Sequence, residues 1–262
     1  MTDKIRLGGM ALTNGVLVHG PTAWGCAIRT DGGEVKVASG TKRVLAARIQ
    51  LPFLRGPVRL LESFAVIPEM RKRLPEARLP IERGPVLVAT VATAVAGQAV
   101  RRSERLGDAT RELLAGMLAL APAVLALRGG ELAAYHGAEH VSIGTYEHGE
   151  KRAKEHERCG SHLIGPLLAA TAAGNILASR APEHLRKPAR VAASVGAVGA
   201  AVEVFAWMTR HPDHLLAKAL AKPGHELQHR LATAEPSAAQ LEVAETALAA
   251  CLELESGDSA PD

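Results

Sequence analysis

The sequence predicts a mainly α-helical, multi-pass membrane protein with a helical bundle and a small N-terminal region that contains β-hairpins. Hydrophobic residues make up 47% of the 262 residues, but aromatic residues make up only 3%. An alanine-rich, aromatic-poor composition favours closely packed helices over a thick β-sandwich core. Four apolar segments between residues 85 and 208 also begin or end near arginine, as membrane helices often do.

The first forty residues alternate between strand-like runs and turn residues. The turns are residues 13–15, which read Thr-Asn-Gly, and residues 31–33, which read Asp-Gly-Gly. Glycine in these turns tolerates the positive φ angles of tight hairpins, so two hairpins are expected. The predicted strands are residues 10–12, 16–18, 24–30 and 34–38. Residues 53–74 are then expected to form one apolar helix with basic ends.

The four apolar segments cover residues 85–100, 113–127, 163–179 and 191–208. A bilayer-spanning helix needs roughly 20 apolar residues, with a range of about 17 to 25, so these segments are at or below the limit. Small residues such as Gly196 would allow close contact between membrane helices. The alternative is a soluble protein in which four alanine-rich helices are buried in a large globular bundle.

Four crossings would return the chain to its starting side of the membrane. We therefore expect an N-terminal α+β region (1–84), a helical membrane region with the candidate motif (85–208) and a C-terminal helical region with a disordered tail (209–262). Residues 1–84 contain fourteen Lys or Arg against seven acids. This basic excess predicts that the motif and both termini face the cytoplasm at the cell membrane.

The charge and the cysteines limit the class of protein further. A net charge of +4 is too mild to indicate a nucleic-acid-binding protein, so no nucleic acid is expected as a partner. The three cysteines, at 26, 159 and 251, are far apart and odd in number. They predict reduced thiols and not a disulfide framework.

The C-terminal region contains a clear helix signal. Ser237 and Gln240 have the spacing of a capping box, in which each side chain bonds to the other residue's backbone N–H. An amphipathic stripe follows at helical spacing; its residues are Leu241, Ala244, Leu248, Cys251 and Leu252. Residues 256–262 are polar and are expected to be disordered.

Residues 136–140 form a His-x-x-Glu-His motif made by His136, Glu139 and His140. On a helix, two histidines four residues apart project from one face, where their imidazoles can bind one metal ion. Glu139 lies beside them, as in hydrolases where a glutamate activates water. We predict a divalent metal site, with Zn²⁺ as the ion and Glu139 as the catalytic residue. The alternative is a polar helix face whose histidines only form hydrogen bonds.

A zinc site needs at least one more ligand from the protein. His156 and Cys159 form a nearby His-x-x-Cys pair, and together with the two motif histidines they would give four ligands. Glu203 is the only acid in the fourth apolar segment, where a carboxylate is costly unless it is paired or bound to a metal. Glu147 shares the motif face but lies about 10 Å along the helix from His140, too far for the same ion.

Two functions from different classes fit this pattern. One is a metal-dependent hydrolase at the membrane face that acts on a peptide or a lipid-linked molecule. The other is a non-catalytic membrane scaffold with a closed structural metal site. Three protein ligands plus water, or completion of the site by Glu203, would favour the enzyme. Four protein ligands, or completion by Cys159, would favour the scaffold.

Several blocks of sequence carry a family resemblance over nearly the whole chain. The most specific block is residues 135–140, followed by Tyr146-Glu147. The other blocks are 8–9, 14–16, 20–21, 52–56, 61–63, His156, 158–160, Glu203, Gln228, 230–231, Thr233, 235–236, Gln240 and Glu242. Together these blocks resemble the YqhQ-like family, bacterial proteins described as metal-dependent, membrane-associated and of unknown function. The resemblance implies a membrane location and a metal ion, but no particular reaction.

The sequence departs from this family pattern in three places. Asn14 stands where the pattern has an acid. Glu157 and Ser161 replace the usual neighbours of the Arg-Cys-Gly core at residues 158–160. The stretch between Glu147 and His156 is shortened.

Overall fold

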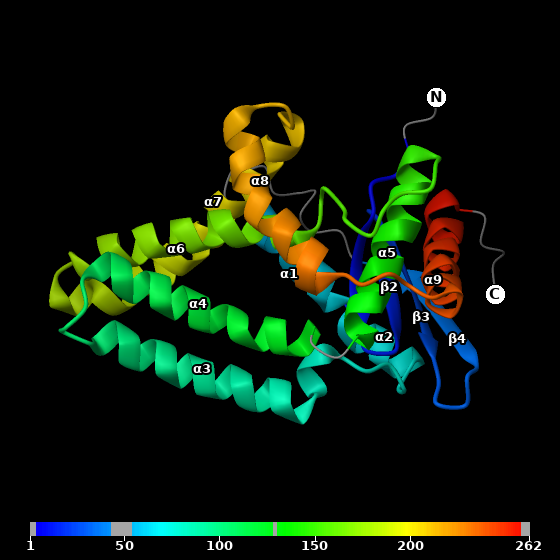
Figure 1. The fold of residues 1–262 in the computed structure, drawn as a ribbon, viewed down its shortest axis with the longest axis horizontal. Helices are drawn as coiled ribbons and strands as arrows, with labels where there is room; N and C mark the ends of the chain where they lie inside the picture. The colour runs from blue at the N-terminus through cyan, green and yellow to red at the C-terminus, as the bar shows by residue number, and fades with distance from the viewer. Residues whose placement is uncertain (1–3, 43–53, 128–129, 258–262) are drawn as a thin grey trace.

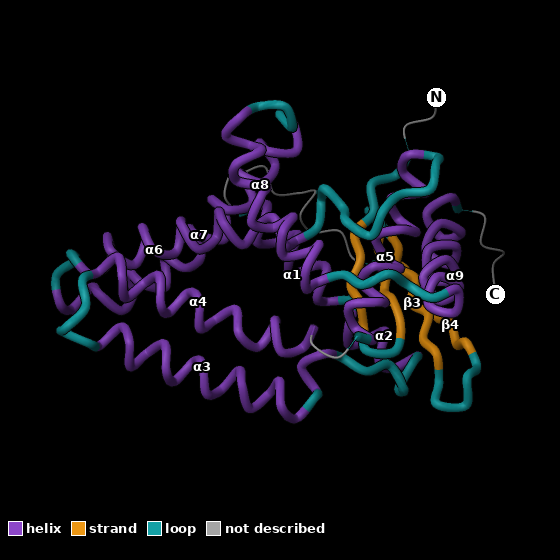
Figure 2. The backbone as a smooth tube through the Cα atoms, viewed as in Figure 1, coloured by secondary structure: helices purple, strands orange, loops and turns teal. Residues whose placement is uncertain are grey.

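The computed structural model describes residues 4–42, 54–127 and 130–257. Its strands lie together at one end of the molecule, and helices form the rest (Figure 2). The strands are β1 (Gly8–Leu12), β2 (Gly15–His19), β3 (Ala23–Arg29) and β4 (Val35–Thr41). They confirm the predicted hairpins. The two hairpins join into one antiparallel sheet of order β1-β2-β3-β4 because β2 also pairs with β3, placing Leu17 opposite Cys26.

Nine α-helices lie in the described part of the chain. They are α1 (Arg55–Ala65), α2 (Ile67–Arg73), α3 (Gly84–Arg102), α4 (Asp108–Leu127), α5 (Glu131–His148), α6 (Ile164–Ser179), α7 (Arg186–Arg210), α8 (Leu215–Leu227) and α9 (Ala238–Ser256). Short 3-10 turns cover Pro80–Glu82, Gly160–Leu163 and Glu183–Leu185, and a π-helical turn covers Gln228–Ala232.

The sheet is covered on both faces, so its strands are buried more fully than those of a surface hairpin. Alternate residues along β2 point to opposite faces, with Val16 and Val18 in one core and Leu17 in the other. Helices α5 and α9 pack over the first face (Figure 1). Residues 66–77, which include α2, cover the second face around Trp24 and Met70.

Helix α9 lies very close to the sheet. An added Cβ at Gly25 would lie 2.3 Å from the carbonyl oxygen of Ala247, so only glycine allows this approach. The predicted capping box is confirmed. The Ser237 side chain accepts a hydrogen bond from the Gln240 backbone N–H, and the Gln240 side chain accepts one from the Ser237 backbone N–H. The predicted stripe is also found, because Ala244, Leu248 and Cys251 are buried against the sheet.

Helices α3, α4, α6 and α7 form an arm that extends away from the sheet (Figure 1). The connections after α3 and after α6 lie at the far end of this arm, so each of the four helices starts or finishes at the end of the arm nearer the sheet. Four helical stretches are long and apolar enough to cross a membrane: Gly84–Arg102, Thr110–Leu127, Gly160–Ser179 and Glu183–Arg210. Only 11% to 22% of each stretch is buried within the protein.

One expectation about the layout needs correction. Residues 54–74 form two helices and not one: α1 ends at Ala65, and α2 restarts with Pro68 in its first turn, where a proline lacking an N–H is tolerated. Residue 53 lies outside the described part. Helix α5, which carries the His-x-x-Glu-His motif, packs on the sheet beside α9, so segments far apart in sequence share one core.

Candidate metal centre

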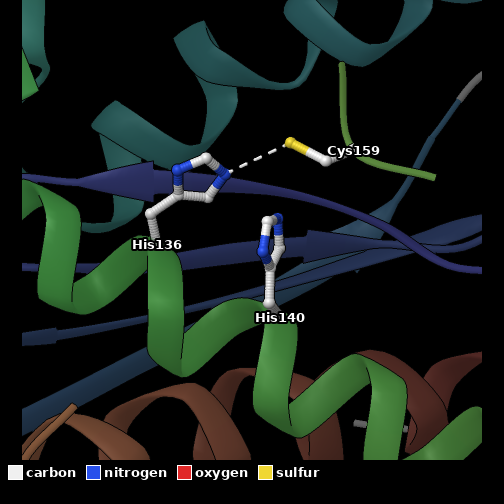
Figure 3. Close-up of side chains that lie close together, drawn as sticks. All are labelled: His136, His140 and Cys159. Carbon is white, nitrogen blue, oxygen red and sulfur yellow. Dashed lines mark hydrogen bonds between the residues drawn. The ribbon is translucent and has the colours of Figure 1, made fainter. Parts of the chain in front are cut away.

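The candidate site forms where α5 meets the loop that follows it. Helix α5 is buried along most of its length, because it lies between the sheet, α9 and the 149–159 loop. It carries His136 and His140 on one face (Figure 3). Cys159, just before the Gly160–Leu163 turn, points toward these two rings from the loop.

Three side chains could hold one metal ion. A ligand atom from each of His136, His140 and Cys159 lies within 4.8 Å of the others. The ring centroids of His136 and His140 are 4.3 Å apart, and Cys159 Sγ lies 3.5 Å from His136 Nε2. Imidazole nitrogens and a thiolate are typical zinc ligands, and Zn–N and Zn–S distances are about 2.0–2.3 Å. The donor types and their spacing therefore fit Zn²⁺.

Hydrogen bonds orient both imidazoles for this role. His136 Nδ1 lies 2.8 Å from the carbonyl oxygen of Ala232, and His140 Nδ1 lies 2.6 Å from that of Lys154. A carbonyl oxygen can only accept, so each Nδ1 carries the proton and each Nε2 keeps a free lone pair in the neutral ring. Such bonds to the second nitrogen are typical of metal-binding histidines. Burial also lowers the pKa of His140, which favours the neutral form that binds metals.

Glu139 is buried beside this group. Its carboxyl group packs against the β1 backbone, where an added Cβ at Gly9 would lie 2.3 Å from Oε1. Burial raises the pKa of the Glu139 carboxyl, and the neighbouring rings of His136 and His156 act in the opposite direction. A raised pKa makes this carboxylate a stronger base than an exposed glutamate.

The group lines a cavity of about 530 Å³. Its polar wall includes His136, Glu139, His140 and Cys159, and its apolar wall comes from β1, α1 and α4. Leu60 and Phe64 of α1 lie at this wall and are 42% and 48% exposed. The candidate metal group therefore borders an open space.

His156 does not join the three-residue group, although its ring centroid is 5.5 Å from that of His140. Its Nε2 lies 3.3 Å from Glu147 Oε2, and its Nδ1 accepts from the Arg158 N–H at 3.2 Å. Both ring nitrogens are thus used within the protein. Burial acts to raise the pKa of Glu147, but the His156 hydrogen bond and the Arg158 charge outweigh it and lower that pKa.

The structure places two other candidates outside the group. Glu203 is in α7, is not part of the His136–His140–Cys159 set, and does not line the cavity beside it. Asn14 bridges the β1–β2 turn to residues 76–78: Nδ2 donates to the Arg29 and Glu76 carbonyls, and Oδ1 accepts from the Arg78 N–H. Asn14 therefore has a structural role at this turn and does not line the cavity beside the candidate site.

His19 is a cavity residue that the sequence did not reveal. Its ring lines the same cavity as the candidate metal group, close to Gly8. Burial and the charge of Lys42 lower the pKa of His19 to about 4, so the ring is neutral near pH 7. The only sequence feature that could have indicated a buried His19 is its place in the Val-Leu-Val-His run of β2.

The fold and the site together define a class of protein: a helix-covered sheet that holds a three-donor metal candidate, attached to four helices able to cross a membrane. Residues 131–254 match the model of a family described as "Protein of unknown function (DUF1385)". This stretch contains the motif, Cys159, Glu203 and most of α9. The comparison with curated proteins and the comparison with solved structures each gave no match. The family match is consistent with an uncharacterised family, and the YqhQ-like assignment remains a resemblance.

Proposed function

We propose that this protein is a metal-dependent hydrolase that works at the membrane surface. The observation that carries the proposal is the oriented donor group: two imidazoles with free Nε2 lone pairs and one thiol converge in an open cavity beside the buried Glu139. Zn²⁺ is the proposed ion because His and Cys donors suit it better than they suit Mg²⁺.

The membrane location is supported by the exposed apolar surface of the arm. Val88, Val91 and Val95 of α3 are 67%, 59% and 66% exposed, and Leu177 of α6 is 65% exposed. Soluble proteins rarely expose contiguous apolar patches of this kind. Lipid around the arm would cover this surface, whereas the soluble-bundle alternative required these helices to be buried.

Each residue of the site has a proposed task. His136, His140 and Cys159 would hold the ion, which when bound would lower the pKa of a water molecule to about 7. Glu139 accepts a proton at its carboxylate, which its buried position makes more basic. The carbonyls of Ala232 and Lys154 keep the two imidazoles in the correct tautomer.

The cavity favours a lipid-linked substrate over a peptide. Its apolar wall includes Leu60 and Phe64 of α1 and Ala126 and Leu127 of α4. Helix α4 belongs to the proposed membrane arm, so an apolar chain can reach the cavity from the bilayer side. A peptide substrate would instead be expected to use backbone donors and acceptors along its path.

A non-catalytic scaffold is the second candidate, and the identity of the third donor favours it. Cys159 completes the group where Glu203 was the ligand expected of an enzyme. Structural zinc sites are often rich in thiolate ligands. They are closed by four protein ligands, however, and the fourth candidate, His156, is engaged with Glu147 and Arg158. The open arrangement therefore favours the enzyme.

Metal content and ligand access test the proposal together. Purified protein in detergent should contain about one Zn²⁺ per chain by elemental analysis. His136→Ala should lose the ion, because two remaining protein ligands rarely hold Zn²⁺ tightly, whereas Glu139→Gln should keep it. His148→Ala is the matched control, since it removes a histidine from the same helix outside the donor group.

Substitution with Co²⁺ then distinguishes the two candidates. An open site should change its visible spectrum when acetohydroxamate is added, because a vacant coordination position accepts this chelating ligand. A closed four-ligand site should give no change, and that result would favour the scaffold. Wild-type protein that binds no ion, or His136→Ala protein that binds as much as wild type, would reject both candidates.

A further inference from the structure

A second cavity of about 630 Å³ lies where the arm meets the rest of the molecule. It is formed by the C-terminal end of α7, by α8, by the 148–158 stretch and by Arg6. His156 and Arg158 line both this cavity and the candidate metal cavity, so the two spaces share a wall. This second cavity has no role in the proposed hydrolysis.

Positive charge predominates around the cavity. Six cationic residues line it, against the two acids Glu155 and Glu157; the cations are Arg6, Arg152, Arg158, Arg210, Lys218 and Lys222. Three of the six have carboxylate partners, Glu150, Glu147 and Asp213. Both acids contact histidines, Glu155 with His229 and Glu157 with His148, and these contacts are ion pairs only when the histidine is protonated. Within the described residues no ion pair joins Arg6, Arg210 or Lys222 to a carboxylate, so the cavity has unbalanced positive charge.

A buried polar atom at the cavity also lacks a partner. His162 is 5% exposed, and its Nδ1 has no hydrogen bond among the described residues. Helix α8 holds this residue in place, because an added Cβ at Gly224 would lie 2.7 Å from His162 Cα. A buried nitrogen without a partner is costly, and a ligand that enters the cavity can satisfy it.

The remaining wall is apolar and faces the proposed membrane boundary. Phe205 and Met208 of α7 and Ala217 and Ala221 of α8 line it. Trp207 lies beside them in sequence at the end of the predicted span, the position where tryptophan anchors membrane helices. Residues 215–216, the first two of α8, are both leucine and are 84% and 54% exposed. Exposed leucines at this position are what a helix lying at the level of the lipid headgroups would present, if the arm spans the membrane as proposed.

We propose that this cavity binds the phosphate group of an anionic membrane lipid. The unpaired cations would hold the phosphate, His162 would complete its contacts, and the apolar wall would take the first part of the acyl chain. A neutral headgroup would leave the positive charge unbalanced. This inference rests on the membrane location proposed above, but it does not depend on the metal or on hydrolysis.

Binding of phosphatidic acid by the full chain in detergent tests the proposal. The probe is a fluorescent phosphatidic acid whose anisotropy is followed as protein is added. Arg210→Gln and Lys222→Gln should each weaken binding about fivefold, as expected for roughly 1 kcal/mol per cation near a membrane surface. Both residues are exposed, so these substitutions should leave the fold intact. Lys187→Gln, at the opposite end of α7, is the matched control and should bind like wild type.

Competition experiments with unlabelled compounds test whether the bound phosphate group belongs to a lipid. Unlabelled phosphatidic acid should displace the probe, whereas inorganic phosphate at the same concentration and phosphatidylcholine should not. Displacement by inorganic phosphate would overturn the lipid assignment, and equal weakening by Lys187→Gln would overturn the cavity assignment. Failure of the membrane proposal can be distinguished from failure of lipid binding, because in that case the protein would stay monodisperse without detergent.

Discussion

At the scale of single residues, the candidate site depends on contacts from distant parts of the chain. His136 and His140 are positioned by α5, but their tautomers are set by the carbonyls of Ala232 and Lys154. The motif spacing predicted the shared helix face correctly. The same spacing could not predict which backbone carbonyls would bind the rings. The carbonyl that contacts His136 is 96 residues away along the chain, and the one that contacts His140 is 14 residues away.

The buried His19 predicts a measurable pH dependence of stability. Its pKa is lowered to about 4 in the folded protein, and an unfolded histidine has a pKa near 6.5. Between these values only the unfolded state takes up a proton, so stability is lost as pH falls through this window. At pH 5 this loss amounts to roughly 2 kcal/mol.

His19→Gln should therefore lose less stability than wild type between pH 7.5 and pH 5. The measurement is urea unfolding in detergent followed by circular dichroism at both pH values. The difference between the two proteins isolates His19, because the other histidines are present in both. An identical loss in the two proteins would contradict a neutral, buried His19.

At the scale of elements, helix α9 packs closely against strand β3. Gly25 has no room for a side chain, because an added Cβ would lie 2.3 Å from Ala247 O and 2.6 Å from Cys251 N. Both are backbone atoms of α9, which cannot move aside without shifting the helix. The C-terminal helix is therefore held to the N-terminal sheet by a requirement for glycine.

Gly25→Ala should destabilise the sheet and α9 by about 1–3 kcal/mol, the usual cost of overpacking. Gly32→Ala is the control in the β3–β4 turn. There the closest atom to an added Cβ is Thr30 Oγ1 at 3.7 Å, so the change should stay within about 0.5 kcal/mol. Urea unfolding of both variants measures the difference, and equal stability of the two would show that α9 approaches the sheet less closely.

At the scale of the whole molecule, the arm and the sheet lie at opposite ends (Figure 1). If the four helices cross the bilayer as proposed, the sheet, α5, α8 and α9 would lie together on one side, and the excess of basic residues in 1–84 predicts that this is the cytoplasmic side. The native cysteines cannot report this topology fully, because Cys26 and Cys251 are completely buried.

Cysteines introduced at exposed glycines test the topology directly. Gly107→Cys, between α3 and α4, should react with a membrane-impermeant maleimide in intact cells. Gly32→Cys, in the β3–β4 turn, should react only after lysis, and the wild-type chain gives the background. The reverse pattern would place the sheet outside the cell, and reaction of both variants in intact cells would show that the arm does not cross the membrane.

The sequence by itself determined the local features. Hairpin turns, the α9 capping box, the four apolar helices and the shared face of His136 and His140 all follow from short-range spacing, because backbone geometry acts over a few residues. The break between α1 and α2 was missed even though Pro68 marked it. Only the tertiary structure decided which distant segments meet. It packed α5 and α9 on the sheet, brought Cys159 and not His156 into the group with His136 and His140, and gave Asn14 a structural role. These outcomes depend on burial and on hydrogen bonds between segments far apart in the chain, which no local pattern records.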